Sequence, residues 1–389
     1  MRALAAVAQM DHPCFEVIVI ADPAAATLVR KSDLPVKLAI HDKPNIAAAR
    51  NLGLDQATAS VVAFLDDDAV PEPSWLTRLV APFADPQVVA STGYVRGRSG
   101  LAWQWRAAFV DSNAQDHPFD QPGRATFPGT AQRAIKTQGT NCAFRRDDLL
   151  DIGGFDPAFH FYLEEADVNL RLSARGGLTA VVPDAVVHHG FAPSARRRAD
   201  RVPLDLREIG ASLAVFQRRH GMTDAAMIRR IAEVRAGLLR HMVSGGLEPR
   251  DIARLMQGLH DGLAEGRSRA LTPLYRRAAS GLPFTPLPQT GPRPGQIIAG
   301  FGRDRAALEA RAAAAFSQGR IVTLICLDRG VRPHRLFFTP QGWWEQTGGR
   351  FGRSDRDRPG RYVWKRFHDR IIAEAKALSH YRPVSAPDP

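Results

Sequence analysis

The chain has 389 residues, of which 44% are hydrophobic, and its formal net charge is +12. This length suits one large domain or two to three ordinary ones. No stretch approaches the roughly 18 consecutive apolar residues of a membrane span, and the N-terminus lacks a small-residue cleavage site, so we expect a cytoplasmic protein. Three distant cysteines, Cys14, Cys142 and Cys326, argue against a zinc site or a disulfide framework.

The positive charge is concentrated near the C-terminus. Residues 296–389 hold 17 Lys and Arg against 9 Asp and Glu, a net charge of +8, which leaves +4 for residues 1–295. This uneven distribution argues against a nucleic-acid-binding protein. A basic C-terminal region predicts peripheral contact with an anionic membrane or glycan, unless its arginines simply form a solvated surface.

The first 95 residues alternate between strand and helix patterns. Strand patterns occur at 15–20, 36–40 and 88–95 and in the run that begins at Val61, and helix patterns at 45–57 and 75–83. This alternation predicts a mostly parallel sheet flanked by helices, the arrangement of α/β proteins. Residues 97–137 have no clear pattern, and we expect an irregular, functional loop. Trp103 and Trp105 in this loop either offer their aromatic faces to a ligand or pack in the core.

Three consecutive aspartates end the run that begins at Val61. In VVAFLDDDAV, the carboxylates Asp66, Asp67 and Asp68 follow an apolar segment typical of a buried strand. Open α/β sheets bind ligands at this end of their strands. Neighbouring carboxylates repel one another unless a cation is present, and Mg²⁺ and Mn²⁺ prefer carboxylate and phosphate oxygens. The pattern indicates either a metal and diphosphate site or a solvated acidic turn.

A second dense region spans residues 139–190. We expect a strand at 141–145, a tight turn at 153–156, a helix at 164–175 and a strand at 178–187. Apolar residues at helical spacing predict three more helices, near 204–219, 224–243 and 249–265. We expect these helices to pack against the rest of the protein rather than to bind a cofactor. Five prolines in 282–295 indicate an extended linker with few contacts across it, followed by a small α+β appendage.

Three segments occur in order over residues 15–190. They are FEVIVIAD; then ARNLG and VVAFLDDDAVP; then GTNCAFRR, GGFDPAFHFYLEEADVNLRL and VPDAVVHHG. In combination they resemble glycosyltransferase family 2, inverting enzymes with the A-type nucleotide-diphospho-sugar transferase fold. The resemblance implies a cytoplasmic enzyme that moves a sugar from a nucleoside diphosphate donor to an acceptor hydroxyl, usually with Mg²⁺ or Mn²⁺.

The resemblance assigns roles to two acidic groups. A cation held by Asp66 and Asp68 would stabilise the charge that develops on the leaving diphosphate. The base that accepts the proton of the acceptor hydroxyl is placed in the helix that begins EEAD, where we choose Glu165, with Glu164 and Asp167 as competitors. The alternative is that these acids only stabilise a helix N-terminus.

Other positions carry weaker expectations. Asp22 falls in the family's nucleotide-binding turn, although the sequence Ala21-Asp22-Pro23-Ala24 departs from the usual pattern. Arg50 contacts either the donor diphosphate or an aspartate, and we assign Asp66 and Asp67 to donor binding as well. His188 or His189 is either a ligand or structural, and His189 is our choice as the third metal ligand.

Arg171 follows Asp167 by four residues, so an ion pair on one helix face is expected there. Family members also open with a strand ahead of the helix that precedes FEVIVI. Residues 1–12 are enough for that helix and no more, so we expect either a misassigned or truncated start or a nucleotide pocket that lacks one wall.

The sequence thus predicts an inverting glycosyltransferase in cell-surface glycan synthesis. We divide it into a catalytic domain at 1–200, a helical extension at 201–281, a linker at 282–295 and a basic α+β appendage at 296–389. The expected partners are a nucleoside diphosphate sugar and a glycan or lipid-linked acceptor, at the inner face of the membrane and without nucleic acid. The alternatives are a metal-dependent nucleotidyltransferase and a non-catalytic scaffold with a degenerate site.

Overall fold

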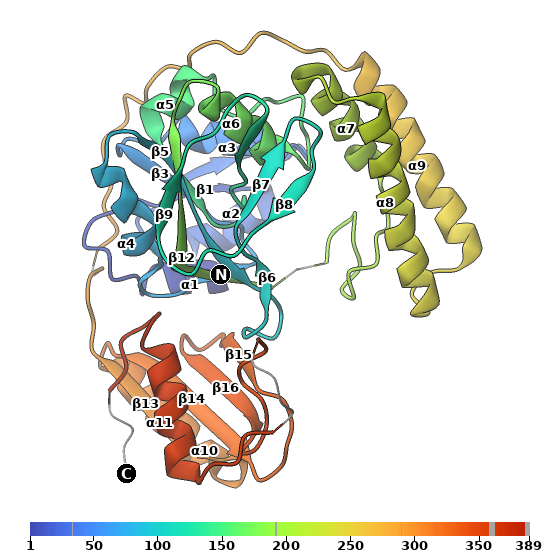
Figure 1. The fold of residues 1–389 in the computed structure, drawn as a ribbon. Helices are drawn as coiled ribbons and strands as arrows, with labels where there is room; N and C mark the ends of the chain where they lie inside the picture. The colour runs from blue at the N-terminus through green and yellow to red at the C-terminus, as the bar shows by residue number, and fades with distance from the viewer. Residues whose placement is uncertain (33, 191–192, 289, 358–361, 386–389) are drawn as a thin grey trace.

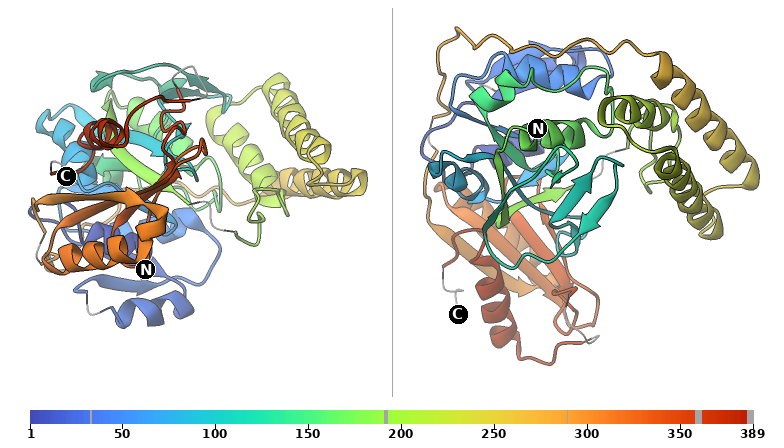
Figure 2. Two further views of the ribbon diagram at one scale, coloured as in Figure 1. Left: turned by 90° about the horizontal axis from the view of Figure 1, so that it is seen from below. Right: turned by 45° about the horizontal axis from the view of Figure 1, so that its top comes forward.

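The computed structural model describes residues 1–389 except 33, 191–192, 289, 358–361 and 386–389. An N-terminal unit, a projecting helical arm and a C-terminal appendage are visible in Figures 1 and 2. Among the described helices, none is both long enough and apolar enough to cross a membrane.

The N-terminal unit is built on a seven-stranded sheet in which β3-β11-β5-β12-β4 lie in that order, with β6 on β5 and β9 on β12. The strands are β3 (Val61–Phe64), β4 (Ala69–Pro71), β5 (Val88–Arg96), β6 (Trp103–Trp105), β9 (Ala125–Phe127), β11 (Cys142–Arg145) and β12 (Leu178–His189). The α/β class is confirmed. The sheet is mixed rather than mostly parallel, because the antiparallel β11 lies between β3 and β5.

Two smaller sheets complete the unit. Strands β1 (Ile18–Ala21) and β2 (Lys37–Ile40) pair in parallel, and β10 (Arg133–Ile135), β7 (Ala108–Asp111) and β8 (Asp116–Pro118) form an antiparallel sheet. The expectation of an irregular loop at 97–137 was wrong, because five short strands lie within it. Segments of three or four residues are too short to show the alternation of apolar and polar residues that predicts a strand.

Helices pack on the sheets of the N-terminal unit and cover both faces of the main one, while α2 packs on β1 and β2. They are α1 (Arg2–Val7), α2 (Pro23–Arg30), α3 (Ile46–Leu54), α4 (Trp75–Val80), η1 (Ala81–Ala84), α5 (Arg146–Asp151) and α6 (Glu164–Ser173). Ala143 of β11 packs with α1 and α4, whereas the next residue, Phe144, packs with α3, α5 and α6. Successive strand residues point to opposite faces, so each face has its own core.

The helical arm contains α7 (Arg207–His220), α8 (Asp224–Val243) and α9 (Pro249–Ser268), which confirms the three predicted helices. Helices α7 and α9 approach closely through glycines. A Cβ at Gly210 would lie 2.1 Å from the carbonyl oxygen of Leu259, and one at Gly262 would lie 1.8 Å from that of Arg207. Only glycine permits this approach of the two backbones.

The appendage is built on a four-stranded sheet with the order β13-β14-β16-β15. Its elements are β13 (Gly295–Phe301), η2 (Gly302–Asp304), α10 (Arg305–Ser317), β14 (Ile321–Asp328), β15 (Arg335–Phe338), β16 (Trp344–Gly349) and α11 (Phe367–Leu378). The first three strands pair in parallel and β15 is antiparallel.

The expectation of few contacts across the linker was wrong. Within the linker, Leu287 is buried in the core of the N-terminal unit and its N–H donates to the carbonyl of Phe15. Beyond it, Trp344 and Leu378 of the appendage share a hydrophobic cluster with Ala6 of α1. The two units therefore bury apolar surface against each other, which a proline-rich sequence alone does not reveal.

Candidate functional site

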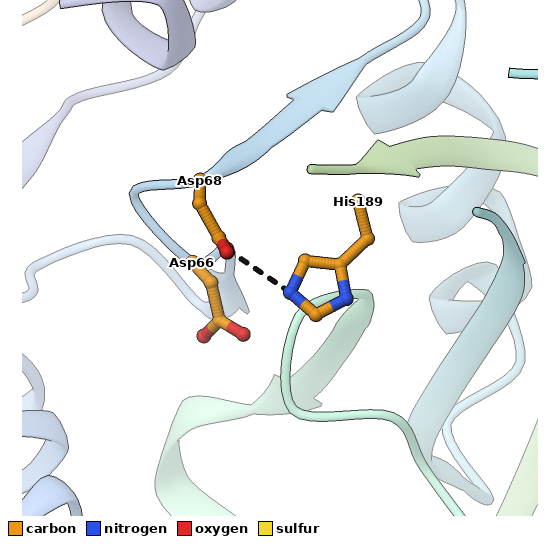
Figure 3. Close-up of side chains that lie close together, drawn as sticks. All are labelled: Asp66, Asp68 and His189. Carbon is orange, nitrogen blue, oxygen red and sulfur yellow. Dashed lines mark ion pairs between the residues drawn. The ribbon is translucent and has the colours of Figure 1, made fainter. Parts of the chain in front are cut away.

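Asp66, Asp68 and His189 meet at one edge of the main sheet. One ligand atom from each lies within 4.8 Å of the others, and His189 Nε2 is 3.0 Å from Asp68 Oδ1. Figure 3 shows the three side chains converging. Two carboxylates and an imidazole form a donor set that suits a divalent ion.

Backbone pairing explains this meeting of distant residues. Asp66 and Asp68 lie in the turn between β3 and β4, and His189 ends β12, where it pairs with Ala69. The N–H of Gly190 also donates to the carbonyl of Asp68 at 2.9 Å. Because strand side chains alternate, His188 points to the other face and His189 to the aspartates. Asp67 is exposed and lies outside the cluster.

Arg50 joins the aspartate turn to the start of α6. Its Nη1 lies 3.0 Å from Glu164 Oε1 and 3.4 Å from Glu165 Oε1, and its Nη2 lies 3.7 Å from Asp66 Oδ1. Burial opposes charge on this guanidinium, but Glu165, Glu164 and Asp66 outweigh it and raise the pKa of Arg50. Of the two roles predicted for Arg50, pairing with acids is the one seen.

The surroundings of Asp66 oppose the negative charge of its carboxylate. Burial raises the pKa of Asp66 above its ordinary value; Arg50 and His189 oppose this, and Glu165 and Asp68 add to it. A carboxylate in this position would be stabilised by a further positive charge. The chemistry of the turn thus fits a bound cation.

The three candidate bases have different surroundings. Glu165 keeps 20% of its side chain exposed, whereas Glu164 is buried. Burial and the neighbouring charge of Glu165 raise the pKa of Glu164 to about 8 despite Arg50. Of this pair, Glu165 is the carboxylate that solvent reaches.

Asp167 does not face the site. Its side chain is 0% exposed, Arg171 donates to Oδ2 at 2.9 and 2.5 Å, and His220 contacts Oδ1 at 2.9 Å. Burial alone would raise the pKa of Asp167, but Arg171 and His220 lower it to about 2. The predicted Asp167–Arg171 ion pair is confirmed, and the suggestion of Asp167 as a base was wrong because both oxygens are already bound.

Two more neighbours bear on the site. Asp22 caps α2 by accepting the N–H of Ala25 at 2.8 Å, so one of its oxygens has a structural partner. Trp105 on β6 lies beside the cluster, with its ring centroid 5.7 Å from that of His189. Trp105 of the 97–137 segment therefore borders the site.

No role was predicted for Gly139, which lies against Glu165 and Arg50. A Cβ there would come within 2.0 Å of Glu165 Oε1 and 2.3 Å of Arg50 Nη2. A glycine next to paired charges leaves room for them, and a GT dipeptide is too common in sequences to signal this role.

A buried network from the appendage supports the strand that carries His189. Glu72 Oε1 contacts His188 Nε2 at 2.7 Å and also accepts a hydrogen bond from Arg382 at 2.5 Å. The Arg382 guanidinium lies 3.7 Å from the ring centroid of Trp344. These partners are up to 310 residues apart in sequence, so no local motif indicates them.

Similar proteins identify the family. Residues 2–153 match the model described as Glycosyl transferase family 2. The succinoglycan biosynthesis protein ExoM of Rhizobium meliloti (strain 1021) is 30% identical over 243 residues, which cover 58% of this chain and 73% of that protein. The O-antigen biosynthesis protein RfbC of Myxococcus xanthus is 28% identical over 223 residues, and this chain covers only 16% of its length.

A solved structure of S. aureus TarS 1-349 in complex with UDP aligns at 14% identity with a TM-score of 0.38, covering 69% of this chain and 84% of that one. The family assignment rests on the sequence matches. With the family model and ExoM in agreement, the chain belongs to glycosyltransferase family 2.

Proposed function

We propose that the chain transfers a sugar from a nucleoside diphosphate donor to an acceptor hydroxyl, with inversion, during synthesis of a cell-surface glycan. The observation that carries this proposal is the cluster of Asp66, Asp68 and His189 next to the accessible Glu165 in a family 2 chain. The roles that ExoM and RfbC are named for, in succinoglycan and O-antigen biosynthesis, support the glycan class.

We assign Asp66, Asp68 and His189 to hold a divalent ion, either Mg²⁺ or Mn²⁺. Such an ion would supply positive charge for the departing diphosphate. The meeting of Asp66, Asp68 and His189 supports this assignment, because one ligand atom from each lies within 4.8 Å of the others. The exposed Asp67 and the capping residue Asp22 remain candidates for donor contacts.

Glu165 is assigned as the general base. It is the least buried acid at the start of α6, and a carboxylate within hydrogen-bond reach of the acceptor can take its proton. Arg50 holds Glu164 and Glu165 beside the aspartate turn. Glu164 then has a positioning role through Arg50.

The appendage is proposed to contact an anionic acceptor or the inner membrane surface. Its net charge of +8 is accompanied by exposed groups such as Trp364, Arg303 and Arg332. Cationic and aromatic side chains together suit an anionic interface. We therefore propose a cytoplasmic enzyme, peripheral to the membrane, that consists of a catalytic domain, a helical arm, a linker and the appendage.

The proposal is tested by measuring nucleoside diphosphate release from a panel of nucleotide sugars, with a cell-envelope extract as the acceptor. We expect turnover of one donor, and a loss of at least about 100-fold in His189→Ala. Asp184→Ala, an exposed aspartate on the same strand, is the matched control and should retain activity. Consumption of a nucleoside triphosphate with pyrophosphate release would instead identify a nucleotidyltransferase.

A further inference from the structure

Helix α8 is apolar on two faces, and only one of them is covered. Met227 and Leu238 are buried on the inner face, in the position that their helical spacing predicts. On the other side, Ile228 is 68% exposed, Leu239 39% and Val243 84%. Packing within the arm explains why the inner face is apolar, but it does not explain the apolar residues on the exposed face.

The exposed residues form one continuous stripe. At about 100° per residue, Ile228, Ala232, Ala236, Leu239 and Val243 fall within a sector of about 80° along the whole helix. All five are exposed. We call these five residues the α8 stripe. Large exposed apolar side chains scattered singly need no explanation, but a stripe on a 20-residue helix marks an interaction surface.

Arginines border the α8 stripe on both sides. Arg235 lies on one edge and Arg229 and Arg240 on the other, and all three are exposed. Within the part of the chain that the structure describes, none of them forms an ion pair. The exposed acid nearest to them in sequence, Glu233, pairs with Arg230 at 2.5 Å. The rim of the stripe is therefore positively charged.

The charge at this rim selects the kind of partner. Two copies of α8 packed stripe to stripe would bring arginines against arginines, which repel. An anionic lipid surface instead attracts the arginines while its acyl boundary accepts the apolar stripe. The neighbouring α9 has no such stripe, because its exposed positions include Arg254, Gln257, His260 and Asp261. We propose that α8 lies in the surface of an anionic lipid bilayer and anchors the protein there.

The arm is fixed to the segment that leads into α6. Arg219 of α7 contacts Asp156 at 2.8 Å, His220 contacts Asp167 at 2.9 Å, and Arg230 of α8 bonds the hydroxyl of Tyr162. Figure 1 shows the arm beside α6. The arm that carries α8 is thus held beside α6, the helix that begins at Glu164 and Glu165. Resting on the proposed function, this arrangement favours a lipid-linked acceptor.

Vesicle flotation with the full chain tests the anchor without any sugar donor. Vesicles of phosphatidylcholine with about 30% phosphatidylglycerol should bind the protein at low salt, and pure phosphatidylcholine should bind it much less. Ile228→Gln/Leu239→Gln/Val243→Gln should lower the partition coefficient at least about tenfold. Arg229→Gln/Arg235→Gln/Arg240→Gln should lower it by a similar factor and flatten the salt dependence.

The control replaces exposed apolar residues that lie outside both α8 and the appendage: Leu28→Gln/Ile40→Gln/Leu282→Gln, each 48–54% exposed. It should bind anionic vesicles within about twofold of the wild type, because none of the three lies on α8. The proposal is overturned if the wild type does not bind anionic vesicles, or if the stripe variant binds them as well as the control does. It is also overturned if light scattering finds the wild type to be a dimer and the stripe variant a monomer. Because this readout needs no donor, it can fail or succeed independently of sugar transfer.

Discussion

At the scale of single residues, the start of α6 separates acids that were equivalent in the sequence. Glu165 is partly exposed, Glu164 is held by Arg50, and Asp167 is enclosed by Arg171 and His220. We predict that Glu165→Gln leaves donor affinity nearly unchanged and lowers turnover by about 100-fold or more, because a positioned base is removed. Single-turnover kinetics and calorimetry measure the two effects. Normal turnover in Glu165→Gln would remove it as the base.

Asp167 gives a prediction about pH and stability. Its pKa is lowered from 3.8 to about 2 in the folded protein, so its contribution is fully present above pH 3.8 and is lost as the pH falls through about 2. The shift corresponds to about 2 kcal/mol. Asp167→Asn should therefore reduce the free energy of unfolding at pH 7, with a difference from the wild type that shrinks between pH 4 and pH 2. Urea unfolding at several pH values measures this, and a constant difference would contradict it.

At the scale of elements, the long and strongly patterned segments were predictable and the short ones were not. The EEAD helix and the three arm helices lie where their periodicity placed them, whereas the four-residue β3 was predictable because an apolar run ends at three aspartates. Antiparallel β11 and the strands within 97–137 could not be read from sequence, since strand direction and three-residue ladders leave no periodic signal. His189 and not His188 lies beside the aspartates, because successive side chains of β12 point to opposite faces and His189 pairs with Ala69, the residue after Asp68.

The segment after α11 supplies an element-scale prediction. Arg382 and Glu72 form an ion pair with side chains that are 0% and 1% exposed. Removing one partner of a buried pair leaves an uncompensated charge, so Arg382→Met should lower the free energy of unfolding by about 3–5 kcal/mol. Arg332→Met removes a surface pair with Asp328 and should change it by less than about 1 kcal/mol. Equal denaturation midpoints for the two variants would contradict the buried role of Arg382.

At the scale of the whole molecule, the appendage is part of the folded enzyme. A fragment ending at residue 281 would expose Ala6 and the faces that pack on Leu287 and Trp344, and would leave Glu72 buried without Arg382. We expect such a fragment to be less soluble and to melt at a lower temperature than the full chain. A fragment as stable as the intact protein in scanning calorimetry would show that the interface contributes nothing.

We have proposed that Asp66, Asp68 and His189 bind a divalent ion together with a nucleoside diphosphate. Titration calorimetry with a panel of nucleoside diphosphates, with Mn²⁺ or with chelator, tests it most directly. We predict that one nucleotide binds at least about tenfold more tightly with Mn²⁺, a difference of about 1.4 kcal/mol, and that Asp68→Ala abolishes this dependence while Asp184→Ala preserves it. Equal affinity of the wild type with Mn²⁺ and with chelator would show that no divalent ion takes part in nucleotide binding.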